Sequence, residues 1–296
     1  MTAERPLSAP PPGQAVADPA PDRHVRNVVA RSGTSFFMGM RVLPPDRRRA
    51  MYAIYAFCRE VDDIADEPGQ PDDKRAALAE WREEIARLYA GRPARPTARA
   101  LLQPVKQFAL PQEEFLAVIA GMETDTAQAV RMQGVDDLMD YCRKVAVAVG
   151  RLSVCAFGVP ARPGPQIADA LGNAFQLTNI LRDMKKDADM NRLYLPGDLL
   201  KAHGVAADAP PHSVLSDPGL AGVCAELVTM ARAQYAEGDR LLAQTGQRKM
   251  RAAVIMKEVY RRTLDRLEAR GWQRLDDPVG LSRAQKVMLA LRYGLL

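Results

Sequence analysis

The segment Tyr55-Ala-Phe-Cys-Arg-Glu-Val-Asp-Asp-Ile-Ala-Asp66 reads as a helix whose C-terminal half carries three aspartates. Asp62 and Asp66 are four residues apart, so a helix places them one turn apart on the same face. Two carboxylates this close repel each other, and burying them costs free energy unless a cation compensates their charge. The dipole at the C-terminal end of a helix also disfavours negative charge. Local helix physics gives no reason for this pair, which therefore indicates a cation-binding function.

A second pair with the same spacing, Asp183 and Asp187, closes the segment Asn179-Ile-Leu-Arg-Asp-Met-Lys-Lys-Asp187. Gln176, Asn179 and the two aspartates step by three or four residues and so line one helix face. A stripe of amides and carboxylates on an apolar helix is costly to bury, but its oxygens suit hydrated Mg²⁺. Two such helix ends that face each other can hold Mg²⁺ against a diphosphate. The sequence therefore predicts an enzyme that ionises prenyl diphosphates.

Composition narrows the fold class and the partners. The chain has 296 residues, 47% of them hydrophobic and only 6% aromatic, which favours helices around one large core or two modest ones. The net charge of +5 suits anionic partners. Long Lys/Arg blocks and aromatic-rich basic patches are missing from the sequence, so we expect no nucleic-acid partner.

The cysteines and histidines favour a reducing compartment and an oxygen-bound metal. The four cysteines are widely spaced without a Cys-x-x-Cys pair, as expected for free thiols in a cytoplasm. The three histidines lie in loop-like segments, which disfavours a zinc site and favours magnesium. The chain begins without the pattern of a signal peptide, and its apolar runs are shorter than the roughly 20 residues of a membrane span. We therefore expect a cytoplasmic protein.

The predicted organisation is a disordered Pro/Ala-rich tail over residues 1–22 and a single all-α domain over residues 23–296. Residues 206–218 are expected to form part of a long loop, and no stretch shows the alternation of a strand. A short basic segment runs from residue 282 to the end. The main expected helices cover residues 47–66, 72–89, 96–107, 113–124, 135–157, 166–187, 220–244 and 249–270.

Several segments together resemble the squalene/phytoene synthase family of head-to-head prenyl transferases, in matching order over residues 25–290. The segments are Ser32-Gly-Thr-Ser-Phe36, Tyr55-Ala-Phe-Cys-Arg59 with its aspartates, Tyr141-Cys-Arg-Lys-Val-Ala146, and Asn173 to Asp183 running on to Arg192-Leu-Tyr-Leu-Pro196. The first segment, with Met40-Arg-Val-Leu-Pro44 and Val149-Gly-Arg-Leu-Ser153, is most similar to the bacterial branch that makes presqualene diphosphate in hopanoid pathways. The resemblance implies an all-α, isoprenoid-synthase-type helical bundle with a central cavity.

The resemblance also implies roles for individual residues. Three Mg²⁺ ions would bridge the diphosphate, bound by Asp62, Asp66, Asn179, Asp183 and Asp187. Tyr141 would lie near the reacting carbons. Gly33 stands where family members often have a second serine, so that diphosphate contact is either absent or supplied by Ser32 or Thr34. The implied diphosphate-binding residues are Ser35, Tyr55, Arg59, Gln176, Asn179, Arg182, Arg192, Tyr260, Arg283 and Lys286.

The implied reaction joins two molecules of farnesyl diphosphate into presqualene diphosphate and releases diphosphate, with either that diphosphate or Tyr141 as the proton acceptor. No Gly-x-Gly-x-x-Gly follows a strand, so we expect that NADPH is not used. Three alternatives stay open. They are a phytoene synthase that uses geranylgeranyl diphosphate, a squalene synthase that completes an NADPH reduction, and a catalytically inactive interaction protein.

The C-terminal segment from Lys286 to Leu296 is both basic and apolar. One interpretation is a last packed helix. The other is a peripheral contact with the inner face of a membrane, through which the hydrophobic substrate would reach the protein. The sequence indicates no oligomeric state.

Overall fold

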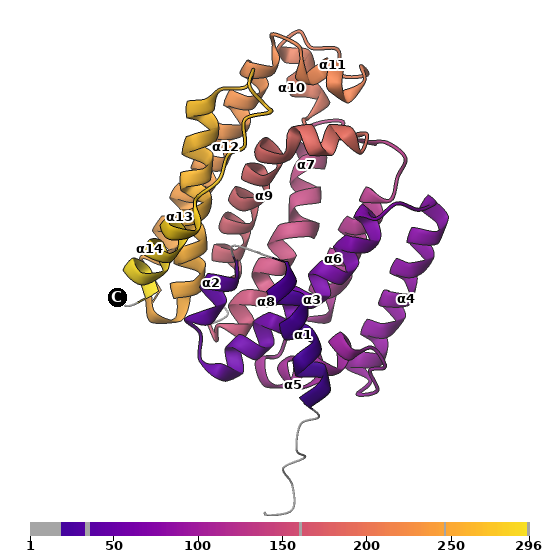
Figure 1. Cartoon of the computed structure of the whole chain (residues 1–296), viewed down its shortest axis with the longest axis vertical. Coiled ribbons are helices and arrows are strands. Elements are labelled where there is room, and N and C mark those ends of the chain that lie inside the picture. The colour runs from indigo at the N-terminus through magenta and orange to yellow at the C-terminus, as the bar shows by residue number, and fades with distance from the viewer. Residues whose placement is uncertain (1–18, 33–35, 160–161, 246, 295–296) are drawn as a thin grey trace, which may run out of the picture.

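The computed structural model describes residues 19–32, 36–159, 162–245 and 247–294, where the chain forms a helical bundle (Figure 1). Most of the predicted tail and Ser35 lie outside the described residues. The helices are α1 (Pro19–Arg31), α2 (Phe36–Arg41), α3 (Pro45–Asp66), α4 (Pro71–Tyr89), α5 (Pro96–Phe108), α6 (Gln112–Asp125), α7 (Val135–Cys142), the π-helical segment η1 (Arg143–Val147), α8 (Ala148–Ala156), α9 (Gly164–Asp189), α10 (Gly197–Ala202), α11 (Pro211–Leu215), α12 (Leu220–Leu242), α13 (Gln247–Arg270) and α14 (Arg283–Gly294).

Proline sets the start of several helices. Pro45, Pro71 and Pro96 occupy the first turns of α3, α4 and α5, where the missing N–H leaves no helical hydrogen bond unmade. The start of α1 at Pro19 places the helical region ahead of the predicted boundary at residue 23. The predicted long loop around residues 206–218 contains the short helix α11.

The helix predicted over residues 135–157 is interrupted by η1. This wider turn lies against glycines of two neighbouring helices. A Cβ atom on Gly121 of α6 would overlap the Val145 side chain, and one on Gly172 of α9 would lie 2.7 Å from the Cα of Val147. The absent side chains give the π turn its space, and such three-dimensional complementarity leaves no periodic signal in the sequence.

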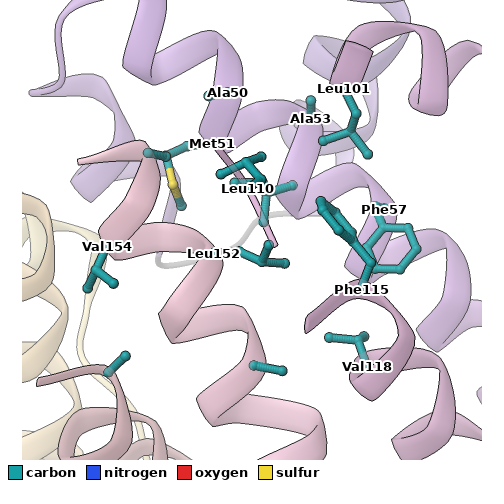
Figure 2. Close-up of a cluster of buried hydrophobic side chains, with 14 of the residues drawn as sticks. Ala50, Met51, Ala53, Phe57, Leu101, Leu110, Phe115, Val118, Leu152 and Val154 are labelled. Atoms are coloured by element: carbon teal, nitrogen blue, oxygen red, sulfur yellow. The ribbon is translucent and has the colours of Figure 1, made fainter. Parts of the chain in front are cut away.

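One large hydrophobic cluster holds α3 against α4, α6 and α8, and Figure 2 shows the part of it between α3, α6 and α8. Phe57 of α3 is fully buried and meets Trp81 and Phe115 edge-on, with ring centroids 5.4 and 5.1 Å apart. Leu152 of α8 is equally buried in the same cluster. Edge-to-face rings add about 0.5–1.5 kcal/mol per pair beyond area burial. This packing fixes the position of α3, whose C-terminal end carries the first acidic pair.

Helix α9 runs through the middle of the bundle, between α8 and α12 (Figure 1). Its end is followed by the strand β2 (Arg192–Leu193), which pairs in parallel with β1 (Val130–Arg131). This two-residue pair fixes the chain after α9 to the chain after α6. Within the described residues, no helix is both long and apolar enough to cross a bilayer.

Candidate active site

A cavity lies between α2, α3, α8, α9 and α13, and it encloses about 1160 Å³ of empty space, part of it open to solvent. Its wall is mostly apolar, with Ile54, Val149, Leu171 and Met256 from four different segments of the chain. Tyr55 supplies one of the polar groups on the wall. A cavity with this lining is typical of a site for an apolar ligand with a polar end.

The acidic pairs continue the faces that line this cavity. On α3, Cys58 is a lining residue, and Asp62 follows it one turn later on the same face. On α9, Gln176 and Asn179 line the cavity, and Asp183 follows one turn after Asn179. Both helices therefore run along the apolar wall and end in carboxylates at the same end of the cavity.

The ends of α3 and α9 are joined directly, although they are more than 100 residues apart in the sequence. Arg192 Nη1, just beyond α9, donates to Asp66 Oδ1 at 2.6 Å. Lys186 Nζ of α9 lies 3.5 Å from Asp66 Oδ2. Burial would raise the pKa of Asp66, but the hydrogen bond and charge of Arg192 outweigh it and hold this pKa below its ordinary value.

Two of the other site carboxyls titrate near neutrality. Burial, followed by the charge of Asp183, raises the pKa of Asp187 to about 7. Burial, followed by the charge of Asp66, raises the pKa of Asp62 to about 6. The pKa of a carboxyl group rises in this way when the group is desolvated beside another negative charge, and a bound cation lowers the pKa again. The site is therefore electrostatically suited to divalent metal.

A buried amide oxygen also indicates that the site suits a divalent metal ion. Asn179 Oδ1 is buried and has no hydrogen-bond partner within the part of the chain that the structure describes, while its Nδ2 donates to Gln176 Oε1 at 3.3 Å. A buried acceptor left unpaired is costly, and a metal ion can satisfy it. Across the described ranges, no three His, Cys, Asp or Glu side chains group closely enough to hold a metal unaided. Mg²⁺ that binds through one or two carboxylates, water and substrate phosphates needs no such group.

The two arginines predicted within the acidic motifs are paired with carboxylates. Arg59 lies 3.4 Å from Asp62 and 2.5 Å from Asp63. Arg182 donates two hydrogen bonds of 2.8 and 2.6 Å to the carboxylate of Asp183. Both guanidinium groups are partly exposed, so a diphosphate that approaches the carboxylates can reach them.

The predicted diphosphate-binding residues of α13 and α14 lie partly at a second, smaller cavity and partly on the surface. Tyr260 lines the main cavity and also, with Arg182 and Lys286, a smaller cavity between α9, α13 and α14. The structure thus brings these three polar residues together. Arg283 is exposed at the first residue of α14. The predicted contact at Ser35 lies outside the described residues.

Tyr141 lies beside a buried acid that sequence reasoning missed. Its hydroxyl donates to Asp125 Oδ2 at 2.8 Å, and the hydroxyl of Tyr194 donates to Asp125 Oδ1 at 2.6 Å. Burial raises the pKa of Asp125 to about 6, against the lowering effect of the Tyr194 hydrogen bond. Burial and then the charge of Asp125 raise the pKa of Tyr141 well above its ordinary value. Asp125 ends α6, so the helix dipole disfavours its charge as it does that of Asp66, but Gly121 rather than an acid stands four residues before it.

Residues 29–287 match the family model described as squalene/phytoene synthase. The chain belongs to the squalene/phytoene synthase family. A presqualene diphosphate synthase of Sinorhizobium fredii is 41% identical over 273 residues, which cover 92% of this chain and 97% of the relative. One from Rhodopseudomonas palustris is 42% identical over 264 residues, with 89% and 94% covered.

The crystal structure of a dehydrosqualene synthase in complex with ligand matches with a TM-score of 0.80 at 25% identity, covering 92% of this chain and 95% of that one. This match confirms the predicted all-α isoprenoid-synthase bundle. The assignment to the squalene/phytoene synthase family confirms the resemblance of the motif segments. The similarity to two presqualene diphosphate synthases confirms the predicted branch. The family binds prenyl diphosphates and typically uses a divalent metal.

Proposed function

We propose that this protein is a presqualene diphosphate synthase that joins two molecules of farnesyl diphosphate head to head. The observation that carries the proposal is the position of two carboxylate-bearing helix ends at the polar end of one apolar cavity. The diphosphate would lie among the carboxylates with its metal ions, and the prenyl chains would extend into the cavity. The sequence similarity to two enzymes of that name supports the choice of product.

Divalent metal, when bound, neutralises the departing diphosphate and so lowers the barrier to breaking the allylic C–O bond. Asp62, Asp66, Asp183 and Asp187 would hold it, and the unpaired Oδ1 of Asn179 would complete the ligand set. We propose three Mg²⁺ ions, since this number is expected from the family resemblance. The chain's cationic groups act on the same diphosphate. They are expected to be Arg59 and Arg182 at the acidic end, with Lys286 beyond Arg182.

The electron pair of the broken C–O bond leaves with the diphosphate, and the resulting allylic cation is attacked by the C2–C3 double bond of the second substrate. Loss of one proton then closes the cyclopropane ring. The two candidate acceptors are the released diphosphate and Tyr141. A tyrosine hydroxyl is protonated at neutral pH, and burial and the charge of Asp125 raise the pKa of Tyr141 further, which favours the diphosphate as the proton acceptor.

The carbocation must be kept from water until the ring closes. The side chains of Ile54, Val149 and Leu171 on the cavity wall carry no nucleophilic group. Phe175 lies at the polar end of this wall and stacks on Tyr260 with ring centroids 4.6 Å apart. The negative faces of aromatic rings stabilise a nearby positive charge.

Product analysis tests the proposal. The purified protein is incubated with farnesyl diphosphate and Mg²⁺, with and without NADPH, and the products are identified by mass. The expected product is presqualene diphosphate in both arms, and conversion to squalene only with NADPH would assign the reducing activity instead. A parallel arm with geranylgeranyl diphosphate, in which prephytoene diphosphate or phytoene formed faster than the C30 product, would favour a phytoene synthase.

We also propose that the enzyme acts in the cytoplasm, at the inner face of the membrane. Helix α14 packs on α13 and α2, and its Leu289 and Ala290 are buried. Its opposite side exposes Met288 and Leu291 next to Arg292, a pattern that suits an anionic lipid surface. Sedimentation with anionic liposomes should fall when Met288 and Leu291 are both replaced by serine, and unchanged sedimentation would remove this assignment.

A further inference from the structure

The carboxyl group of Asp125, the last residue of α6, is buried behind the acidic site and takes no part in the chemistry proposed above. The residue is only 5% exposed and does not line the main cavity. Its two oxygens accept hydrogen bonds from Tyr141 and Tyr194, whose rings stack with centroids 4.8 Å apart. Each carboxylate oxygen therefore has a fixed partner, and the side chain is held in one orientation.

Asp125 also contacts the cation that orients Asp66. Its backbone carbonyl accepts a hydrogen bond from Arg192 Nη2 at 3.0 Å, and the same nitrogen donates to the carbonyl of Ala65 at 2.8 Å. Arg192 Nη1 donates to Asp66 Oδ1 at 2.6 Å. One guanidinium, 6% exposed, thus joins the end of α6 to the last turn of α3.

The segment that carries Arg192 is held at two points by Asp125. The carbonyl of Asp125 binds the guanidinium of Arg192, and its carboxyl binds the hydroxyl of Tyr194 two residues later. Pairing of β2 with β1 adds a third restraint on the same backbone. The buried charge of Arg192 therefore lies between two acids, with Asp66 on the side of the acidic site and Asp125 on the opposite side.

We propose that Asp125 is a positioning residue for the reaction, because it holds Tyr194 and Arg192 and thereby fixes the orientation of the Asp66 carboxylate. With Asp66 Oδ1 engaged by Arg192, Oδ2 is directed toward Lys186 of α9 and remains available to a ligand. A carboxylate held in its binding orientation loses little rotamer freedom when it binds. This inference rests on the proposed function, since it concerns the same site.

Asp125→Asn tests the role without changing the size of the side chain. The amide accepts one tyrosine hydroxyl but presents a donor to the other, and it removes the negative charge behind Arg192. Loss of a group that orients a metal ligand typically lowers metal affinity about 10–100-fold. We therefore expect the Mg²⁺ concentration at half-saturation of inorganic pyrophosphate binding, measured by calorimetry, to rise about tenfold or more. This readout needs no turnover.

Glu84→Gln is a matched control. Glu84 is fully buried and accepts hydrogen bonds from the backbone of Ala94 and Arg95 and from the side chain of Arg87. Both variants lose a buried carboxylate, so a general loss of stability affects both. Only the change at Asp125 is expected to shift the Mg²⁺ dependence of pyrophosphate binding.

A wild-type Mg²⁺ dependence in folded Asp125→Asn protein would overturn the inference. If that variant does not fold, Tyr194→Phe decides the question in the same titration, because it removes one hydroxyl and keeps the ring. A severalfold weaker Mg²⁺ response then supports the positioning role, and an unchanged response rejects it. A wild-type protein that binds Mg²⁺ and pyrophosphate but makes no presqualene diphosphate would instead refute the proposed function alone.

Discussion

Lowering the pH from 8 to 6 should weaken Mg²⁺-dependent pyrophosphate binding, because two site carboxyls take up protons in this range. Burial and the charge of Asp183 raise the pKa of Asp187 to about 7, and burial and the charge of Asp66 raise that of Asp62 to about 6. A carboxyl group binds metal in its ionised form, so these raised pKa values mean that binding is strongest at pH 8 and is lost as the pH falls.

The size of the effect follows from the two pKa values. A group with a pKa of 7 is about 90% ionised at pH 8 and about 10% at pH 6, whereas one with a pKa of 6 is still about half ionised at pH 6. If both must be ionised, the competent fraction falls from about 0.9 to about 0.05, which weakens binding about 20-fold. The protons released by the two carboxyls on binding rise from about 0.1 at pH 8 to about 1.4 at pH 6.

Calorimetry in buffers of different ionisation enthalpy counts these protons directly. The protonation of pyrophosphate and its Mg²⁺ complex is measured in the same buffers without protein and subtracted. Asp187→Asn serves as the matched variant, and its proton release at pH 6 should be lower by about 0.9, the share of the lost group. A wild-type proton count equal to that of the ligand alone would refute the electrostatic reasoning.

Three further predictions follow from the packing and from the acidic pairs. Asp62→Ala and Asp183→Ala should each lower turnover by at least about 100-fold, and full turnover in either would count against the site. Asp62→Ala should do so without lowering the thermal midpoint, because it relieves the repulsion between the Asp62 and Asp66 carboxylates. Phe157→Ala should enlarge the cavity and raise the use of geranylgeranyl over farnesyl diphosphate in a competition assay, whereas an unchanged ratio would exclude Phe157 from chain-length control. Gly172→Ala should destabilise the protein by about 1–3 kcal/mol in urea unfolding, because its Cβ would lie 2.7 Å from the Cα of Val147, and a gain in stability would contradict the close contact between α9 and η1.

Helix boundaries were readable from the sequence where a local signal sets them. Pro71 and Pro96 open α4 and α5 at or next to the predicted first residues, because proline excludes the preceding residue from the helix. The strands β1 and β2 gave no signal, since two residues are too short to show alternation. The π turn η1 depends on Gly121 and Gly172 in other helices, so it follows from tertiary contact alone.

The acidic pairs were readable for the same reason, because a spacing of four residues on a helix fixes which side chains share a face. The contact of Arg192 with Asp66 was not, since the two residues are 126 positions apart. Its predicted contact with diphosphate stays a prediction, and in the structure its guanidinium donates to Asp66 and two backbone carbonyls. Asp125 was missed because a single acid has no periodic partner, and its tyrosine contacts cross the fold.

The cavity draws its wall from both halves of the chain, with α3 emerging early in synthesis and α13 starting only at Gln247. In a nascent polypeptide that stops before α13, the cavity lacks the wall that α13 supplies, so its apolar lining is exposed to water. Contacts between such distant segments form slowly compared with local helices. We expect the incomplete chain to depend on chaperones. It can protect a carbocation from water only after α13 has closed the cavity.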